Sequence, residues 1–157
     1  MLPEVDLNAA WDVQVAKLEA TGTRLVTCNV ATDPMGQAYI EDGVPCVVVC
    51  VAQPIEDRLF TLFHEIGHHV LGHTKGWSSI PLWEVEYGAD RFAINAMAEI
   101  DPGNPHYEAK SRAHIRPLLQ SMIDAGIWNH VDLKIADWAG CRIGRRARKM
   151  IEVYDAA

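Results

Sequence analysis

Apolar positions along the chain follow two different periods, and each period predicts its own kind of element. Short apolar runs predict strands over 23–30, 37–41 and 45–51, with TDPMGQ as a turn between the first two. Asp42-Gly43 separates the last two runs and predicts a hairpin turn. The third run, PCVVVCV, is apolar on both faces, so it is expected to lie covered within the sheet.

Longer stretches repeat apolar residues every three or four positions, as amphipathic helices do. Asp6 can cap the first of these helices, whose apolar side is expected to include Val13 and Leu18. Gly72 is a natural stop for the second helix, and Pro117 is expected to bend the fourth. These elements predict an α+β fold with a small three-stranded antiparallel or mixed sheet and a C-terminal helical part. The six predicted helices cover 7–20, 56–71, 82–100, 106–125, 131–139 and 143–154.

A chain of 157 residues is long enough for one ordinary domain, or for one domain with a small appendage. Its composition, 49% apolar and 22% charged, is typical of soluble globular proteins. The longest apolar run, 44–52, is far too short to cross a bilayer, and the acidic start MLPEVDLNAAWD lacks the features of a secretion signal. We therefore expect a cytoplasmic protein without a disulfide scaffold, in which Cys46 and Cys50 are buried thiols rather than zinc ligands.

The formal net charge of −7 is unevenly distributed along the sequence. The segment CRIGRRARK, residues 141–149, holds five basic residues and no acid, and without those five the charge is −12, from nine basic and twenty-one acidic residues. The segment is either a solvated helix face or a surface for an acidic partner or for nucleic acid. The strongly acidic remainder favours a protein partner over DNA. The five basic residues are Arg142, Arg145, Arg146, Arg148 and Lys149.

The segment HEIGHHVLGH, residues 64–73, places four of the seven histidines and one glutamate on or just after the second predicted helix. On a helix, His64 and His68 lie about 40° apart on successive turns, so both imidazoles can reach one metal ion. Glu65 is rotated by about 100° from His64, where a carboxylate can take a proton from a water molecule. Two imidazoles plus a carboxylate ligand and a vacant position are typical of catalytic zinc. We therefore expect a Zn2+ site with Glu65 as its catalytic base.

The third ligand is expected on the next predicted helix, in the segment WEVEYGADRFA, residues 83–93. Glu86 and Asp90 are four residues apart and share one face of that helix. Glu86 is the expected ligand. Asp90, one turn further along, is expected to accept a hydrogen bond from the distal nitrogen of a ligand histidine, with His64 as the favoured donor.

Other ligand sets fit the spacing less well. In the metzincin pattern, Thr74 stands where the third histidine belongs, and Leu71 stands where a glycine is needed. His73 lies half a helical circle from the first histidine, beyond the expected helix end, and is kept as an alternative ligand. Glu84 is another alternative, although no acid follows it four residues later. His69 is expected to be exposed or to support a ligand from behind, and a helix with surface histidines is the alternative without a metal.

The segments FHEIGHHVLGH and EYGADRFAINAM together resemble the ImmA/IrrE family of zinc metallopeptidases. In that family the ligand glutamate precedes an A-[N/D]-x-F-A segment, which residues 89–93 match. The resemblance covers roughly residues 20–100 and implies a minimal thermolysin-like zincin fold. It implies that the zinc ligands and the catalytic base are the residues already singled out, namely His64, His68 and Glu86 as ligands and Glu65 as base.

Two features depart from the family pattern and concern the substrate cleft rather than the metal site. The run INAMAEIDPGNP is longer and more polar than the usual continuation of the second helix, and the loop over 74–81 is short. We expect a metallopeptidase core over 1–105 and a C-terminal helical segment over 106–157.

Many family members carry a helix-turn-helix-like segment after the metallopeptidase part, and residues 132–152 resemble one. Ala136 and Gly140 are four apart, as small residues are where the first helix of such a motif meets its turn. The basic second helix could follow phosphates along a duplex. The alternative is that these helices pack on the core or present a docking face.

Two classes of function follow. In the first, the protein is a zinc endopeptidase that holds an extended peptide along the strand over 37–41 or its neighbour. By resemblance, its substrate would be a helix-turn-helix transcriptional repressor, cleaved to derepress genes of a mobile element or stress response. The alternative is a non-catalytic zinc-containing regulatory module that binds a partner protein or DNA, although a structural site has no need of Glu65. The candidate oxyanion donors are Tyr87, His106, Tyr107 and His114.

Overall fold

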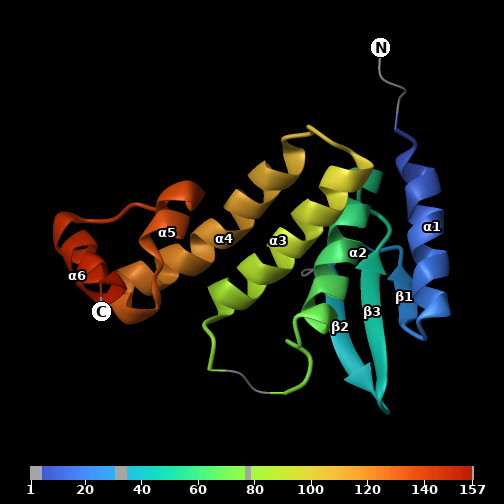
Figure 1. Cartoon of the computed structure of the whole chain (residues 1–157), viewed down its shortest axis with the longest axis horizontal. Coiled ribbons are helices and arrows are strands. Elements are labelled where there is room, and N and C mark those ends of the chain that lie inside the picture. Colours follow the sequence, from blue (N-terminus) through green and yellow to red (C-terminus); the bar gives the residue numbers. More distant parts are fainter. Residues whose placement is uncertain (1–4, 31–34, 77–78, 157) are drawn as a thin grey trace. The chain divides into compact units, whose positions relative to one another are not determined.

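The computed structural model describes residues 5–30, 35–76 and 79–156 of an α+β chain (Figure 1). Within these residues there are three strands and six α-helices, which confirms the predicted fold class. None of the described helices is long and apolar enough to cross a membrane.

The chain divides into two compact units. The first unit consists of Met1–Ser79 and Gly88–Tyr107, and the second consists of Ile80–Tyr87 and Glu108–Ala157. The domain boundary predicted from sequence lies between residues 105 and 106, two residues before the division that follows Tyr107. The segment Ile80–Tyr87 belongs with the C-terminal helices instead of with the residues around it in sequence.

A mixed sheet of three strands lies in the first unit: β1 (Arg24–Cys28), β2 (Gly36–Glu41) and β3 (Val44–Cys50). The strand order is β1-β3-β2, with β3 parallel to β1 and antiparallel to β2. Asp42 and Gly43 join β2 to β3 with φ angles of 51° and 78°, and two positive φ values are what a type I′ hairpin requires. The hairpin was predicted. Of the turn predicted over 32–37, residues 32–34 lie outside the described residues, and Gly36 and Gln37 belong to β2 instead.

The first helix, α1 (Leu7–Ala20), begins as predicted at Asp6, whose Oδ1 accepts a hydrogen bond from the Ala9 N–H at 3.1 Å. Its buried side is the predicted one only in part. Val13 is 50% exposed, whereas Leu18 is buried and Trp11 packs against the core. Even a partly buried indole removes more apolar area from water than a valine does, so the helix is turned to bring Trp11 inward.

The second helix, α2 (Ile55–Val70), packs with α1 on one face of the sheet. Leu18 of α1 and Leu62 of α2 form one buried cluster with Val47 and Val49, which point to the same side of β3. The third helix, α3 (Leu82–Ile100), contributes Ala93 and Met97 to a second buried cluster, which also holds three residues of α2. Those three residues are Leu59, Phe60 and Phe63.

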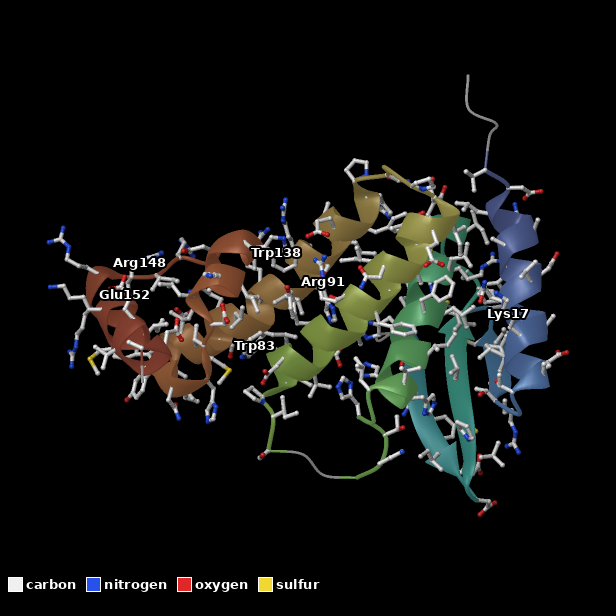
Figure 2. All side chains as sticks on the ribbon, in the orientation of Figure 1. Lys17, Trp83, Arg91, Trp138, Arg148 and Glu152 are labelled. Carbon is white, nitrogen blue, oxygen red and sulfur yellow. The ribbon has the colours of Figure 1, made fainter. Side chains whose placement is uncertain are left out.

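The second unit has its own apolar core, built by α4 (His106–Asp124), η1 (Trp128–His130), α5 (Leu133–Ala139) and α6 (Arg145–Asp155). The helix α4 continues through Pro117, and η1 was not predicted. Trp83, labelled in Figure 2, is 5% exposed, and its Nε1 donates a hydrogen bond to the His130 carbonyl at 2.7 Å. The core also includes Ile115, Leu119, Val131, Ala136 and Ile151.

The pair α5 and α6 has some features of a helix-turn-helix. Gly140 ends α5 with a φ angle of 80°, and residues 140–144 connect the helices, one more than the usual three or four. Arg148 of α6 donates hydrogen bonds of 2.7 and 3.1 Å to the two carboxylate oxygens of Asp137 on α5, and these bonds hold the pKa of Asp137 below its usual value. The other four basic residues of segment 142–149 are exposed, as predicted for a set that cannot all be buried.

Candidate metal centre

The helix α2 presents His64 and His68 on successive turns of one face. It does so because its other face is anchored by Leu59, Leu62 and Phe63, which are all buried. The side chains of His64, Glu65 and His68 are themselves buried, with 6–9% of each residue exposed. Buried imidazoles and carboxylates need polar partners, so each nitrogen and oxygen of this cluster is expected to contact a hydrogen-bonding group or a metal ion.

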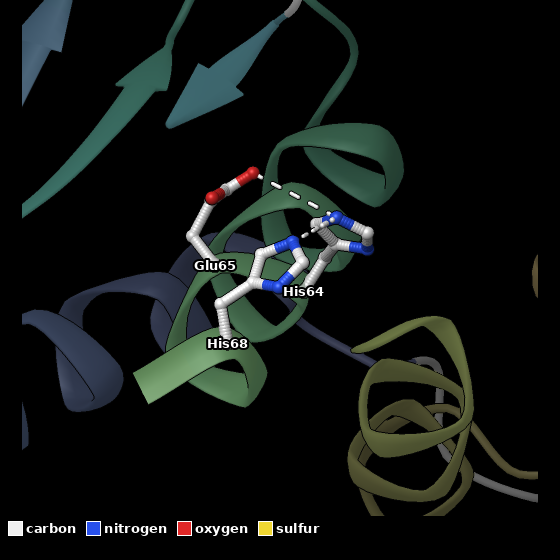
Figure 3. Close-up of side chains that lie close together, drawn as sticks. All are labelled: His64, Glu65 and His68. Atoms are coloured by element: carbon white, nitrogen blue, oxygen red, sulfur yellow. Dashed lines mark hydrogen bonds and ion pairs between the residues drawn. The ribbon is translucent and has the colours of Figure 1, made fainter. Parts of the chain in front are cut away.

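The two imidazoles face each other through the same ring atom. His64 Nε2 and His68 Nε2 lie 3.0 Å apart, and the Glu65 carboxylate lies 3.9 Å from His64 Nε2 (Figure 3). One potential ligand atom from each of the three residues lies within 4.8 Å of the others. Such a group of nitrogen and oxygen donors around one point can hold a metal ion.

Asp90 of α3 fixes the orientation of His64. The carboxylate Oδ1 of Asp90 accepts a hydrogen bond from His64 Nδ1 at 2.7 Å, and Asp90 is fully buried. A neutral imidazole that donates from Nδ1 carries its lone pair on Nε2, the atom that points into the cluster. The contact predicted between these two residues is therefore present, with the nitrogen assignment that a metal ligand needs.

A glycine brings α3 close enough for that contact. A Cβ atom built on Gly67 of α2 would lie 3.0 Å from the Cβ of Phe92 on α3. A side chain at position 67 would press the two helices apart, and Asp90 precedes Phe92 by two residues on the same helix. The glycine in HEIGH thus serves the packing that places Asp90 against His64.

His68 has a different partner on its distal side. Its Nδ1 lies 2.9 Å from Nδ1 of His73, the first residue after Gly72. His73 therefore contacts the ring edge of His68 that faces away from His64. From sequence, His73 was predicted only as an alternative ligand, and its contact with His68 was not predicted. The only available signal was the helix-stopping Gly72, which lets the chain turn back on the helix end.

His69 does not face the cluster. Its Nε2 donates a hydrogen bond to the Cys46 carbonyl of β3 at 2.8 Å, and its Nδ1 lies 2.9 Å from the Thr74 hydroxyl. The ring therefore ties the end of α2 to the sheet. His69 is half-buried, and these two contacts go to the sheet and to Thr74 rather than to a ligand histidine, so the expectation that His69 is exposed or supports a ligand from behind is wrong.

The strand β2 passes directly beside Glu65. A Cβ atom built on Gly36 would lie 3.1 Å from Cγ of Glu65 and 2.5 Å from Cγ2 of Thr61. Only glycine leaves room for this approach of β2 to α2. Gly36 was not predicted to lie at the site, because a glycine at a strand start carries no signal of what lies opposite it.

Glu86, the predicted third ligand, lies one turn before Asp90 on α3 and belongs to the second unit. There, one of its carboxylate oxygens lies 3.6 Å from His114 Nε2. The alternative ligand Glu84 is exposed. The assignment of Glu86 as a ligand stays a prediction.

Two of the candidate oxyanion donors are committed to other partners. The hydroxyl of Tyr107 donates to Asp101 at 2.7 Å, and burial together with this carboxylate raises the pKa of Tyr107 far above its usual value. His106 Nε2 lies 2.8 Å from the Asp57 carboxylate. Tyr87 packs against Trp83 and Trp138 in the second unit, and His114 lies beside Glu86 there.

The donor set suits zinc. A zinc ion binds imidazole nitrogens at roughly 2.0–2.1 Å, and two such nitrogens 3.0 Å apart can share one ion. Both nitrogens belong to rings with a partner on the opposite nitrogen, as metal-binding histidines usually have. The carboxylate of Glu65 lies at the side of the pair rather than between them (Figure 3).

Comparisons with protein-family models, with curated proteins and with solved structures each find no match. The resemblance to the ImmA/IrrE family therefore stays a prediction from the two sequence segments quoted above.

Proposed function

We propose that the protein is a zinc-dependent endopeptidase. The observation that carries this proposal is the buried arrangement on α2, in which His64 Nε2 and His68 Nε2 face each other with Glu65 beside them. The hydrogen bond from His64 to Asp90 supports it, because an oriented ligand with a carboxylate behind it is common at catalytic zinc. His64, His68 and Glu86 would hold the ion, with Glu86 assigned from sequence.

The chemistry divides between the ion and the chain. When bound, zinc supplies a Lewis acid that polarises a peptide carbonyl and lowers the pKa of water. Glu65 takes a proton from water and returns it to the leaving amine, a role that requires a carboxylate within reach but not coordinated. The close approach of Gly36 to Glu65 supports β2 as the strand along which an extended peptide pairs.

The substrate follows from the family resemblance rather than from the site. We propose a helix-turn-helix transcriptional repressor, whose cleavage derepresses genes of a mobile element or stress response. We place this reaction in the cytoplasm, and the four free cysteines are compatible with a reducing compartment.

The deciding experiment is co-expression of the protein with candidate repressors from the same genome, followed by a search for cleavage fragments. Glu65→Gln should keep zinc and fold but lose cleavage by orders of magnitude, because an amide cannot take the proton. Glu56→Gln is the matched control, since it makes the same change on the first turn of α2. Cleavage by Glu65→Gln at the parent's rate would refute the proposal.

One observation favours the second function, a non-catalytic zinc module that binds a partner. Arg145, Arg146 and Lys149 are exposed on α6, where they are available to an acidic protein or to DNA. Under that function, partner binding would persist in Glu65→Gln and no fragment would form with the parent. We favour a protein partner over DNA because the rest of the chain is strongly acidic.

A further inference from the structure

His73 has the geometry of a partner for one zinc ligand rather than of a ligand itself. We infer that His73 is a positioning residue that holds His68 in the tautomer and orientation needed to bind the ion. This inference rests on the proposed metal site. It concerns how the site is built, so it can fail while the site itself stands.

The chain turn that delivers His73 is well defined. Gly72 has a φ angle of 79°, the His73 N–H donates to the His68 carbonyl at 2.8 Å, and the Gly72 N–H donates to the His69 carbonyl at 3.1 Å. This pair of hydrogen bonds is the Schellman arrangement, which reverses the chain at a helix end. It carries the residue after the glycine back alongside the last turn, where His68 lies.

The ring of His73 is also held from a second side. A Cβ atom built on Gly88 of α3 would lie 3.7 Å from Cε1 of His73, so the ring lies close to α3 at a position without a side chain. The rings of His68 and His73 meet edge to face, with centroids 5.2 Å apart and an interplanar angle of 61°. The 2.9 Å contact between their Nδ1 atoms therefore comes from two constrained rings.

The chemistry of imidazole decides what this contact does. A nitrogen that binds a metal needs its lone pair, so His68 can bind through Nε2 only with its hydrogen on Nδ1. That hydrogen then points at Nδ1 of His73, which must accept it. The opposite arrangement, with His73 donating, would leave a hydrogen on His68 Nε2, directed at the position of the ion. An acceptor at the position of His73 Nδ1 therefore favours zinc binding.

The two ligand histidines consequently differ in how they are held. His64 donates to Asp90, a carboxylate that has no hydrogen to donate when ionised. This contact therefore allows only the tautomer of His64 that carries its hydrogen on Nδ1. His68 donates to a neutral ring that could also donate, so its tautomer is set by metal binding and by His73 together.

Zinc affinity of the purified full-length chain, measured by competition with a chromophoric chelator, tests the inference without any substrate. His73→Phe keeps an aromatic ring but removes the acceptor, and it should weaken zinc binding roughly 10- to 100-fold. His73→Asn places an amide oxygen near the lost Nδ1 and should restore affinity to about threefold of the parent. His69→Phe, which removes a neighbouring tether that does not face the cluster, should leave zinc affinity unchanged.

Thermal unfolding of the chelator-treated variants separates positioning from packing. A positioning residue should change zinc affinity while the metal-free melting temperature of His73→Phe stays close to that of the parent. Parent-like zinc affinity in His73→Phe, or an equal loss in His73→Asn, would overturn the inference. Failure of the parent to bind zinc would instead remove the metal site itself, and with it the proposed function.

Discussion

At the scale of single residues, Asp90 is the most constrained polar group of the candidate site. It is fully buried, and a buried carboxylate is costly unless it is paired. Its hydrogen bond from His64 is short, at 2.7 Å. The carboxylate thus stabilises His64 in one tautomer, and His64 in turn keeps the carboxylate from being an isolated buried charge.

Asp90→Ala should weaken zinc binding by roughly 10- to 100-fold, which is the usual effect of losing the partner behind a metal-binding histidine. The loss should be smaller than that of His64→Ala, which removes the ligand itself. Chelator competition on the folded variants gives both values. Asp90→Asn is the control for shape, because its side-chain oxygen can still accept from His64 Nδ1. An unchanged zinc affinity in Asp90→Ala would show that Asp90 is a structural acid and not part of a metal centre.

At the scale of elements, the candidate site depends on how closely α2 and α3 approach each other. Gly67 and Gly88 lie on these two helices, and both are helical glycines with ordinary φ angles. The two positions differ in the atoms that the Cβ of a substituted alanine would contact. At position 67 it would lie 3.0 Å from the Phe92 Cβ, whereas at position 88 its nearest contact is a Leu71 methyl group at 3.4 Å.

Gly67→Ala should therefore destabilise the protein, by about 1–3 kcal/mol as overpacking usually does, and should also weaken zinc binding by moving Asp90 away from His64. Gly88→Ala is the matched control, with an expected gain of about 0.5–1 kcal/mol because alanine favours the helix. Urea unfolding of the metal-free variants measures the first effect, and chelator competition measures the second. Equal stability changes in the two variants would show that the helix contact at Phe92 is not tight.

At the scale of the whole molecule, charge separates the basic segment of α6 from an acidic remainder. Arg148 is hydrogen-bonded to Asp137. Arg145, Arg146 and Lys149 are exposed and lie near the N-terminal end of α6, which has no side-chain capping hydrogen bond. Positive charge near a helix N-terminus is unfavourable in isolation. An acidic partner would offset that cost, and the formal charge of −12 outside segment 142–149 would repel a duplex.

We expect weak duplex binding by the parent and slower partner association after Arg145→Glu/Arg146→Glu. Duplex affinity at two salt concentrations checks the first expectation, because each phosphate contact makes binding more sensitive to salt. Association kinetics with the identified repressor check the second. Submicromolar, salt-sensitive duplex binding that the double reversal abolishes would instead make α5 and α6 a DNA-binding surface.

The sequence by itself determined most of the local structure. Helix starts and stops at Asp6 and Gly72, the Asp42-Gly43 hairpin and the spacing of His64 and His68 all depend on neighbours within a few residues. Such short-range features follow from backbone geometry and hydrogen bonding that the local sequence carries. The α+β class followed from the same elements.

Only the tertiary structure decided which groups meet across elements. Two of these features bring together residues far apart in sequence, namely the parallel pairing of β1 with β3 and the approach of Gly36 to Glu65. A third, the inward position of Trp11, is one that the apolar periodicity of the helix did not predict. The contact of His73 with His68 required the chain reversal at Gly72, which carries His73 back along the helix end. These contacts depend on close packing between elements, where a single Cβ changes the distance that two helices or a helix and a strand can reach.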